Sequence, residues 1–494
     1  MMQSSNRQCN TFQSAVGVFL QSCNAPETLR ELLARMGVSV ATTTINSAIK
    51  SLSKQADVAI RHLGQSLLVS YAYDNLDIDL KHSIPTVENP QDTLAHLSTI
   101  TMLPYHPSIK LESLSYSQEL WEKSRHNLNA RFQDIPSVTF DQLHSIYPEE
   151  PHPSGLTRRQ RFGAWKYLVD LVEFGPSYFR KYKLECSKCA PETIQQIPLT
   201  KTSQTPLRAN NISPSTVPNN AAVLEDMFRQ AGIGDPTDQD SDDEDHNPSS
   251  NKQLREIGNS VVIVFGDLLT GQHVRSLVES RSIEPTPWRR MQFVVFGMGL
   301  FHLKMACADA IWRIFIRSNT STSDTNTLME HVSQIRPKET GKISSKPGFR
   351  RMHEVIQHVG IVSRLDVWRL AAKKVNAAHV SLNDFAKSEP TWKELEAMAN
   401  DIITRNGNRK QFGRKKLLPD AKRDKQLENT ILREEYFLLY EEMSHALNNG
   451  DIGRVEACFL PWIFIFSGCG KHKYATEMRR HLENIHFVYP KPLR

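Results

Sequence analysis

The sequence is poor in cysteine and has no long apolar run, and each shortage excludes a class of protein. Its seven cysteines are an odd number scattered over 494 residues, unlike the closely spaced cysteines of a disulfide scaffold. No stretch approaches the roughly 20 apolar residues that cross a bilayer. Residues 1–10 also lack the basic and apolar regions of a secretory signal. We therefore expect an intracellular protein in a reducing compartment, with no membrane as a partner.

The chain also lacks the motifs of several common chemistries. No P-loop, serine nucleophile elbow or kinase motif is present. Gly297 and Gly299 follow an apolar stretch, but His302 occupies the third glycine position of a dinucleotide fingerprint. No small-molecule cofactor is therefore evident.

One cysteine pair has the spacing of metal ligands. Cys186 and Cys189 form a CxxC, which is half of a zinc site, and Cys469 and His472 are its candidate distant partners. A single pair without a second pair nearby is a weak signal for zinc, so ordinary thiols are the simpler interpretation.

The charge distribution is compatible with a nucleic-acid partner. The net charge of +6 includes an acidic block at 235–245, so the rest of the chain is more basic than the total suggests. Basic residues with interleaved aromatics at 157–183, and a second basic stretch at 409–416, suit a phosphate backbone and stacked bases. Solvated basic surfaces are the competing interpretation. The second stretch is also typical of a nuclear-import signal, so we expect a nuclear rather than a cytoplasmic location. The predicted DNA-binding residues are Arg158, Arg159, Arg161, Lys166, Arg409, Lys410, Arg414, Lys415 and Lys416.

Two apolar, β-rich runs each stop at an aspartate. Residues 67–73 are followed by Asp74, and residues 260–265 by Gly266 and Asp267. After Asp267 the pattern predicts a helix at 270–280, a strand at 293–296 and a helix that begins near Leu300. A strand, helix and strand in this order predict parallel pairing through a crossover helix.

The remaining patterns divide the chain into seven parts. The length predicts two or three compact units with linkers. Residues 33–45 resemble a helix-turn-helix turn, for which two packed helices with no DNA role are the competing interpretation. The fold class that we expect is α/β, mixed and helix-rich, with a sheet core split by helical and disordered insertions. The predicted parts are a helical region at 1–66, the first half of the core at 67–110, a helical insertion at 111–190, a disordered acidic linker at 191–258, the second half of the core at 259–316, a loop at 317–348 and a helical region at 349–494.

The two strand-end aspartates suggest a metal site. An unpaired carboxylate at the end of a buried strand is costly, and two carboxylates from neighbouring strands can hold Mg²⁺ or Mn²⁺ ions for phosphoryl transfer. We expect Asp74 and Asp267 to be metal ligands and catalytic residues, with His302 as a further candidate near the active-site strand. Aspartates that only form turns, and a histidine that is only a hydrogen-bonded core residue, are the competing interpretations.

A third acidic ligand would come from the C-terminal helices. We favour Glu456 because it enters an apolar run, where a charge needs a reason. Asp451 has a simpler explanation as a helix N-cap, and Glu477 has one as a solvated helix residue.

The order of several blocks resembles a protein family. Residues 73–80 (YDNLDIDL), 266–270 (GDLLT), 296–305, 450–454 (GDIGR) and 473–475 (KYA) look like an uncharacterised domain-of-unknown-function family that is expanded in mushroom-forming fungi and associated with transposons. The likeness extends from about residue 20 to the end. More distantly, the chain resembles RNase H-fold DDE transposases, in which the first acid lies on the first strand and the second directly after the fourth. The resemblance implies an RNase H-like core with an Asp/Asp/Glu metal site.

Three hypotheses for function follow. The first is a transposon-derived, Mg²⁺-dependent protein that processes DNA, and the second is an inactive or domesticated relative that binds DNA or protein without cutting. The third is a metal-dependent glycosyl or nucleotidyl transferase that uses Asp77 and Asp79, which match a DxD motif.

Overall fold

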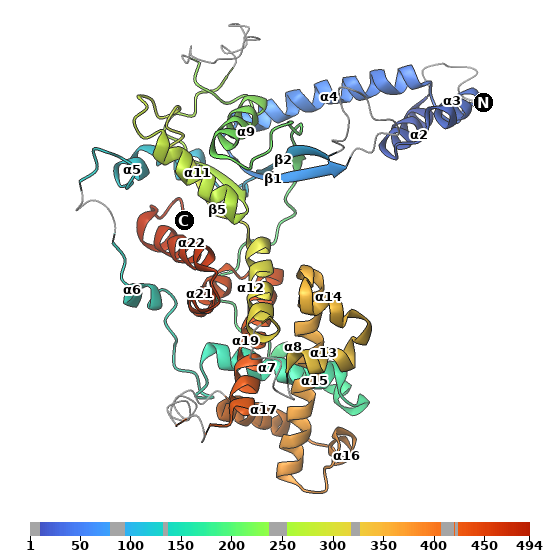
Figure 1. The fold of residues 1–494 in the computed structure, drawn as a ribbon, viewed down its shortest axis with the longest axis vertical. Helices are drawn as coiled ribbons and strands as arrows, with labels where there is room; N and C mark the ends of the chain where they lie inside the picture. Colours follow the sequence, from blue (N-terminus) through green and yellow to red (C-terminus); the bar gives the residue numbers. More distant parts are fainter. Residues whose placement is uncertain are drawn as a thin grey trace. The chain divides into compact units, whose positions relative to one another are not determined.

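The computed structural model describes residues 10–79, 94–131, 137–236, 254–317, 327–406, 419 and 423–494. The chain divides into two compact units, each built from separated segments (Figure 1). The first unit comprises Met1–Ala130 and Thr202–Gly297, and the second comprises Arg131–Lys201 and Met298–Pro492. In the described part of the chain, no helix combines the length and apolar character needed to span a bilayer.

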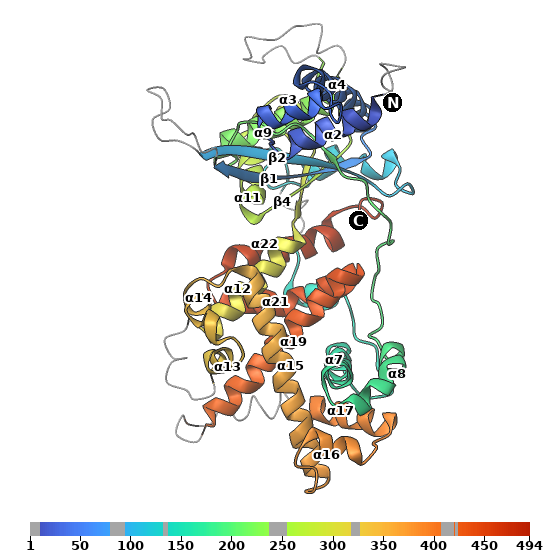
Figure 2. The same ribbon diagram turned by 90° about the vertical axis from the view of Figure 1, so that its right-hand side faces the viewer.

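A five-stranded mixed sheet with the order β3-β2-β1-β4-β5 forms the centre of the first unit (Figure 2). Strand β1 pairs antiparallel with β2 and parallel with β4, and β2 pairs antiparallel with β3. The structure confirms the predicted strands near 67–73, 260–265 and 293–296. The strands are β1 (Val69–Asp79), β2 (Leu94–Pro104), β3 (Thr205–Pro206), β4 (Val262–Gly266) and β5 (Val294–Met298).

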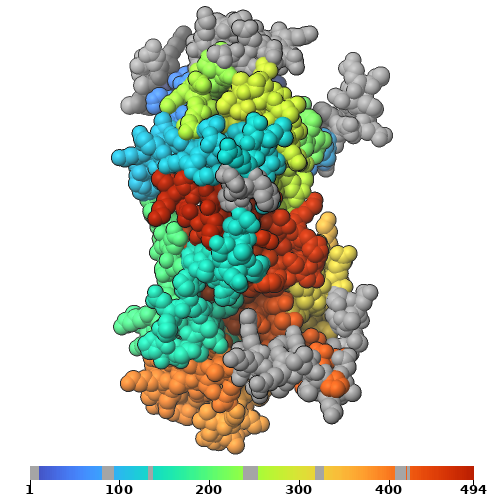
Figure 3. Space-filling view, turned by 90° about the vertical axis from the view of Figure 1, so that its left-hand side faces the viewer, coloured from blue at the N-terminus to red at the C-terminus, as the bar shows by residue number. Residues whose placement is uncertain are grey.

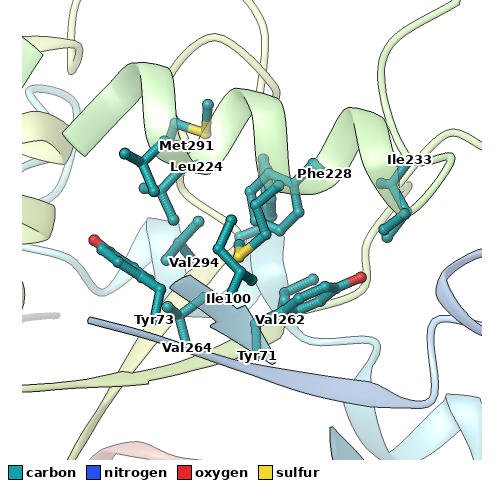
Figure 4. Close-up of a cluster of buried hydrophobic side chains, with 14 of the residues drawn as sticks. Tyr71, Tyr73, Ile100, Leu224, Phe228, Ile233, Val262, Val264, Met291 and Val294 are labelled. Atoms are coloured by element: carbon teal, nitrogen blue, oxygen red, sulfur yellow. The ribbon is translucent and has the colours of Figure 1, made fainter. Parts of the chain in front are cut away.

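Helices α9 (Val217–Gln230) and α11 (Leu268–Ser280) pack against each other and share a hydrophobic core with the sheet. Figure 4 shows this core, to which Tyr71 and Val264 contribute from the strands and Phe228 from α9. The rings of Tyr71 and Phe228 meet edge to face, with their centroids 5.7 Å apart. The unit also contains η1 (Leu111–Leu114) and α5 (Ser117–Glu122).

Helix α9 lies in the 191–258 segment that the sequence pattern predicted to be disordered linker. The polar residues at its start are a helix cap, since the Thr216 side chain accepts a hydrogen bond from the backbone N–H of Asn219 and a proline follows in the first turn. Val223, Leu224, Met227 and Phe228 then repeat at helix spacing and are buried. The described residues of this segment are therefore partly structured, while residues 237–253, with most of the acidic block, lie outside the described residues.

Three helices begin the chain, α2 (Thr11–Ser22), α3 (Glu27–Arg35) and α4 (Thr42–Gln65). They correspond to the predicted helical region at 1–66. Between α3 and α4 the chain turns at Gly37, whose φ of +73° is a left-handed conformation that glycine adopts without strain.

The second unit is helical in the part of the chain that the structure describes. Residues 317–348 were predicted to be a loop, but they contain the helices α13 (Leu328–Ile335) and α14 (Thr340–Ser345). These helices form because Thr327 caps α13, and because Leu328, Val332 and Ile343 are buried. A capping box formed by Thr157 and Gln160 starts α7 (Arg158–Phe174). The elements are α6 (Phe140–His144), α7 (Arg158–Phe174), η3 (Ser177–Tyr182), α8 (Lys183–Lys188), α12 (Leu300–Phe315), α13 (Leu328–Ile335), η5 (Pro337–Glu339), α14 (Thr340–Ser345), α15 (Gly348–Val375), α16 (Leu382–Lys387), α17 (Trp392–Asn406), α19 (Lys425–Asn449), α20 (Ile452–Ala457), α21 (Phe459–Gly468), α22 (His472–Glu483) and the π-helical η7 (Asn484–Val488).

Candidate functional site

The sheet register places Asp74 and Asp267 at the same level of two neighbouring strands. Tyr71 pairs with Val264, and Asp74 and Asp267 each follow three residues later in the same direction. β1 and β4 are adjacent and parallel, with Asp74 on β1 and Asp267 at the first position after β4. The first two acids that the sequence analysis predicted therefore lie on, or directly after, two neighbouring strands of the first unit.

Each of the two carboxylates accepts a hydrogen bond from a nearby backbone N–H. Asp267 is the N-cap of α11, and its Oδ1 accepts a hydrogen bond of 2.7 Å from the backbone N–H of Thr270. Asp74 is exposed, and its Oδ1 accepts a hydrogen bond of 2.8 Å from the backbone N–H of Asn75. These contacts orient the two side chains, and carboxylate oxygens are ligands that a hard cation prefers.

A buried tyrosine links the aspartates to the core. Burial raises the pKa of the Tyr73 hydroxyl above its usual range, and the negative charge of Asp267 raises it further. The protonated hydroxyl donates to Oδ1 of Asn220 over 2.8 Å. The Asn220 amide in turn donates to the backbone oxygen of Thr216 over 2.7 Å and contacts His273 Nδ1 at 2.8 Å. This chain of contacts connects β1, α9 and α11 beside Asp267.

Sequence reasoning missed Asn220 and His273. Asn220 is fully buried but lies in a polar segment that was read as linker, where an asparagine is unremarkable. The signal that could have found it is the apolar repeat that follows in α9, since an asparagine at the start of an amphipathic helix faces the same core.

The DxD residues of the transferase hypothesis lie near the end of β1. Asp77 Oδ1 is 2.7 Å from His96 Nδ1 and accepts from the Asn75 amide at 3.0 Å. The hydrogen bond with His96 is the main cause that lowers the pKa of Asp77. Asp79, at the last position of β1, is exposed. One member of the motif is thus already held by its own strand pair.

Glu456, the favoured third acid, lies in the second unit and is held by three side chains. Its Oε1 accepts from His481 Nε2 at 2.8 Å, and its Oε2 accepts from His486 Nε2 at 2.7 Å and from the Tyr147 hydroxyl at 2.7 Å. Only 4% of the residue is exposed. Burial alone would raise the pKa of this carboxyl, but the hydrogen bonds from the two histidines and the tyrosine outweigh it and lower the pKa to about 2.

Glu456 also forms part of the wall of a cavity of about 1610 Å³ within the second unit. Figure 3 shows the α6–α7 segment, in teal, beside the orange-red C-terminal helices that form other parts of this wall. Aliphatic side chains from α15, α17 and α19 line much of the cavity, together with Tyr147, Arg158 and Arg159. A large cavity with a few polar groups is the form that binding sites commonly take.

The two other candidate acids have structural partners. Asp451 is the N-cap of α20, as predicted, and it also accepts from the backbone N–H groups of Ile194 and Gln195. Glu477 is buried, contrary to the expectation of a solvated residue, and its Oε2 lies 3.5 Å from Arg480 Nη1. Its position on the inward face of α22 explains the burial.

All four predicted DNA-binding residues of α7 form ion pairs within the second unit. Their side chains are at most about one third exposed. A phosphate group would therefore compete with a carboxylate for each of them. The pairs are Arg158 with Glu192 (3.8 Å), Arg159 with Glu442 (3.2 Å), Arg161 with Glu192, and Lys166 with Asp170 (2.5 Å). The other predicted residues, Arg409, Lys410, Arg414, Lys415 and Lys416, lie outside the described residues.

His302 is in the first turn of α12, half-buried, with its ring against that of Phe301. Within the described ranges, no group of three or more histidine, cysteine, aspartate or glutamate side chains is arranged around a metal position. Asp74 and Asp267 are a pair, and two protein carboxylates together with water and substrate phosphate are a usual coordination set for Mg²⁺.

The fold defines a mixed α/β protein with one five-stranded mixed sheet and a large helical second unit. The chain belongs to a family of unknown function, DUF6589, whose model matches residues 139–494. The match includes Asp267, His302 and Glu456 and begins after Asp74. No curated protein and no solved structure matches the chain.

Proposed function

We propose that this chain is a divalent-metal-dependent protein that processes DNA, with an RNase H-like sheet of the transposase kind in which Asp74 and Asp267 hold Mg²⁺ or Mn²⁺. The observation that carries the proposal is the register of β1 and β4, which places the two aspartates three residues beyond paired positions on adjacent parallel strands. A DNA substrate agrees with the nuclear location that the basic stretch at 409–416 suggests.

The sheet topology supports the proposal. The resemblance to DDE transposases requires one acid on the first strand and another directly after the fourth, and Asp74 lies on β1 while Asp267 directly follows β4. These strands could have been far apart in the sheet, yet they are neighbours. Aspartates that only form turns would not have to follow neighbouring strands.

The residues present also fit the chemistry. Mg²⁺ prefers carboxylate and water oxygens. A bound divalent cation supplies charge stabilisation for an in-line displacement at phosphorus. Asp267 is fixed by its cap, with Oδ1 bound to Thr270 N–H, so its second oxygen has a defined direction. Asp74 lies on the exposed part of β1, where a nucleic-acid strand has access.

In the proposed reaction, a water oxygen forms a bond to phosphorus while the bond from phosphorus to the 3′ oxygen breaks. The products are a 3′-hydroxyl and a 5′-phosphate, so atoms balance without a further reactant. The role of the two aspartates is to hold the cation with their negative charge and so to orient the phosphodiester.

The test is cleavage of labelled single- and double-stranded DNA with Mg²⁺ or Mn²⁺. We expect Asp74→Asn and Asp267→Asn each to lower the cleavage rate by roughly 100-fold or more, the loss typical of removing a transition-state charge interaction. Asparagine keeps the cap of α11, so the fold should survive. Asp79→Asn, which changes an exposed acid on the same strand, is the control and should cleave normally.

Binding without cutting is the second candidate function, and one observation favours it. Both oxygens of Glu456 are occupied by hydrogen bonds from its own unit, so this carboxylate already has a structural role. DNA binding by the wild type that is unaffected by either asparagine substitution, with no cleavage by any form, would support this candidate and refute the first.

A further inference from the structure

Among the three N-terminal helices of the first unit, α2 and the turn between α3 and α4 pack against the start of α4. Gly17 of α2 lies against Ile45 of α4 so closely that an added Cβ would be 2.8 Å from the isoleucine side chain. Ile45 is fully buried, and Ser39 and Val40 of the connecting turn are buried as well. The turn between α3 and α4 is therefore fixed against α2 and sets the direction of α4.

From its start to Lys54, helix α4 presents a polar face that carries no negative charge, and Asp57, one turn further along this face, lies 3.8 Å from Arg208. Thr43, Ser47, Lys50 and Lys54 follow one another at spacings of three or four residues, so they lie on one side of the helix, and all four are exposed. The sequence contains no aspartate or glutamate between Glu31 and Asp57. Hydroxyl groups near the start of a helix followed by two lysines complement the base edges and phosphates of a DNA groove.

We propose that α4 is a recognition helix that enters the major groove of duplex DNA, with Thr43 and Ser47 at base edges and Lys50 and Lys54 on phosphates. In helix-turn-helix modules the second helix lies in the groove and its N-terminal residues reach the bases, which is the part of α4 that the buried turn fixes. The inference rests on the proposed function only in that both concern DNA. It adds that the substrate is double-stranded and is held by a surface separate from the two aspartates.

The decisive experiment is fluorescence anisotropy of the full chain with a labelled duplex of mixed sequence in EDTA, which removes metal-dependent cleavage from the measurement. We expect the double variant Lys50→Glu, Lys54→Glu to bind at least about tenfold more weakly. The slope of log Kd against log salt concentration should fall by about 2, because two phosphate contacts are lost.

The matched control is Lys342→Glu, Lys346→Glu, which makes the same charge change at two exposed lysines four residues apart in the second unit. It should leave Kd within about twofold. Equal weakening by both double variants would show a general charge effect and overturn the proposal, as would a wild type that does not bind duplex DNA at low salt.

A second copy of the chain is the alternative occupant, because α2, α3 and the residue after α3 expose the apolar side chains of Phe12, Phe19, Leu32 and Met36. Sedimentation of the same variants separates the two. Loss of self-association with unchanged DNA affinity in the Lys50, Lys54 variant would assign the surface to the second copy and refute our inference. Cleavage is measured in a separate assay with the Asp267→Asn variant. A protein that does not cleave DNA can therefore still bind it in the anisotropy assay, so the two proposals fail independently.

Discussion

Replacing Glu456 with glutamine should destabilise the second unit in a pH-dependent way. The carboxylate is 4% exposed and accepts hydrogen bonds from His481, His486 and Tyr147. Its pKa in the folded protein is about 2, against an ordinary value of 4.5. Glutamine approximates the protonated carboxyl, because it has the same shape without the charge.

The magnitude follows from linkage between protonation and folding. A folded-state pKa below the unfolded value contributes stability above the unfolded pKa, and this contribution is lost as the pH falls through the folded pKa. A difference of 4.5 against about 2 corresponds to roughly 3 kcal/mol at pH 5, which decreases to roughly 1.4 kcal/mol at pH 3. The glutamine variant should therefore be least stable relative to wild type above pH 5.

Hydrogen exchange measured by mass spectrometry can follow this effect in peptides from α20 and α22. At a given pH the intrinsic exchange rates of variant and wild type cancel, so the ratio of exchange rates reports the change in opening free energy. We expect the variant to exchange roughly 200-fold faster at pH 5 and roughly 10-fold faster at pH 3.

Glu150→Gln, at an exposed position of the same unit, is the control and should exchange like wild type at both pH values. A ratio for the Glu456 variant that does not change between pH 5 and pH 3 would refute the reasoning, because it would mean that the charge of Glu456 contributes nothing.

Predictions at four further positions concern stability. Arg364→Met removes the fully buried partner of three carboxylates and should destabilise by about 3–5 kcal/mol, measured by denaturant unfolding. Asp267→Ala should cost about 1 kcal/mol through loss of the α11 cap, whereas Asp267→Asn should stay within a few tenths, a difference visible in Tm. Gly271→Ala places a Cβ 2.4 Å from the Phe296 ring and should destabilise by about 1–3 kcal/mol. Gly341→Ala, in a helix with open space around it, should stabilise by about 0.5–1 kcal/mol.

The strands and their aspartates were readable from the sequence because their signals are local. The apolar runs before Asp74 and Asp267 end abruptly, and strand and helix periods follow each other after Asp267. The sequence did not predict that β1 and β4 are neighbours in the sheet, because this pairing joins strands nearly 200 residues apart in the chain. The sequence predicted the two acids, and the topology relates them to each other.

In the second unit, the sequence did not predict which side chains pair with the candidate site residues, because these partners are distant in the chain. Glu456 stood out because an acid in an apolar run needs a partner, but nothing identified His481 and His486 as those partners. The basic residues of α7 looked available for phosphate because Glu442 lies 283 residues beyond Arg159, so their ion pair has no local pattern.

The central claim is that a divalent cation binds beside Asp74 and Asp267. Iron(II) can replace Mg²⁺ at such sites, and with ascorbate and peroxide it generates hydroxyl radicals that cut the polypeptide near the bound metal. With duplex DNA present, we predict backbone cuts near residues 74 and 267 that disappear in Asp267→Asn. Cuts that are absent from the wild type, or that persist unchanged in the variant, would contradict the account.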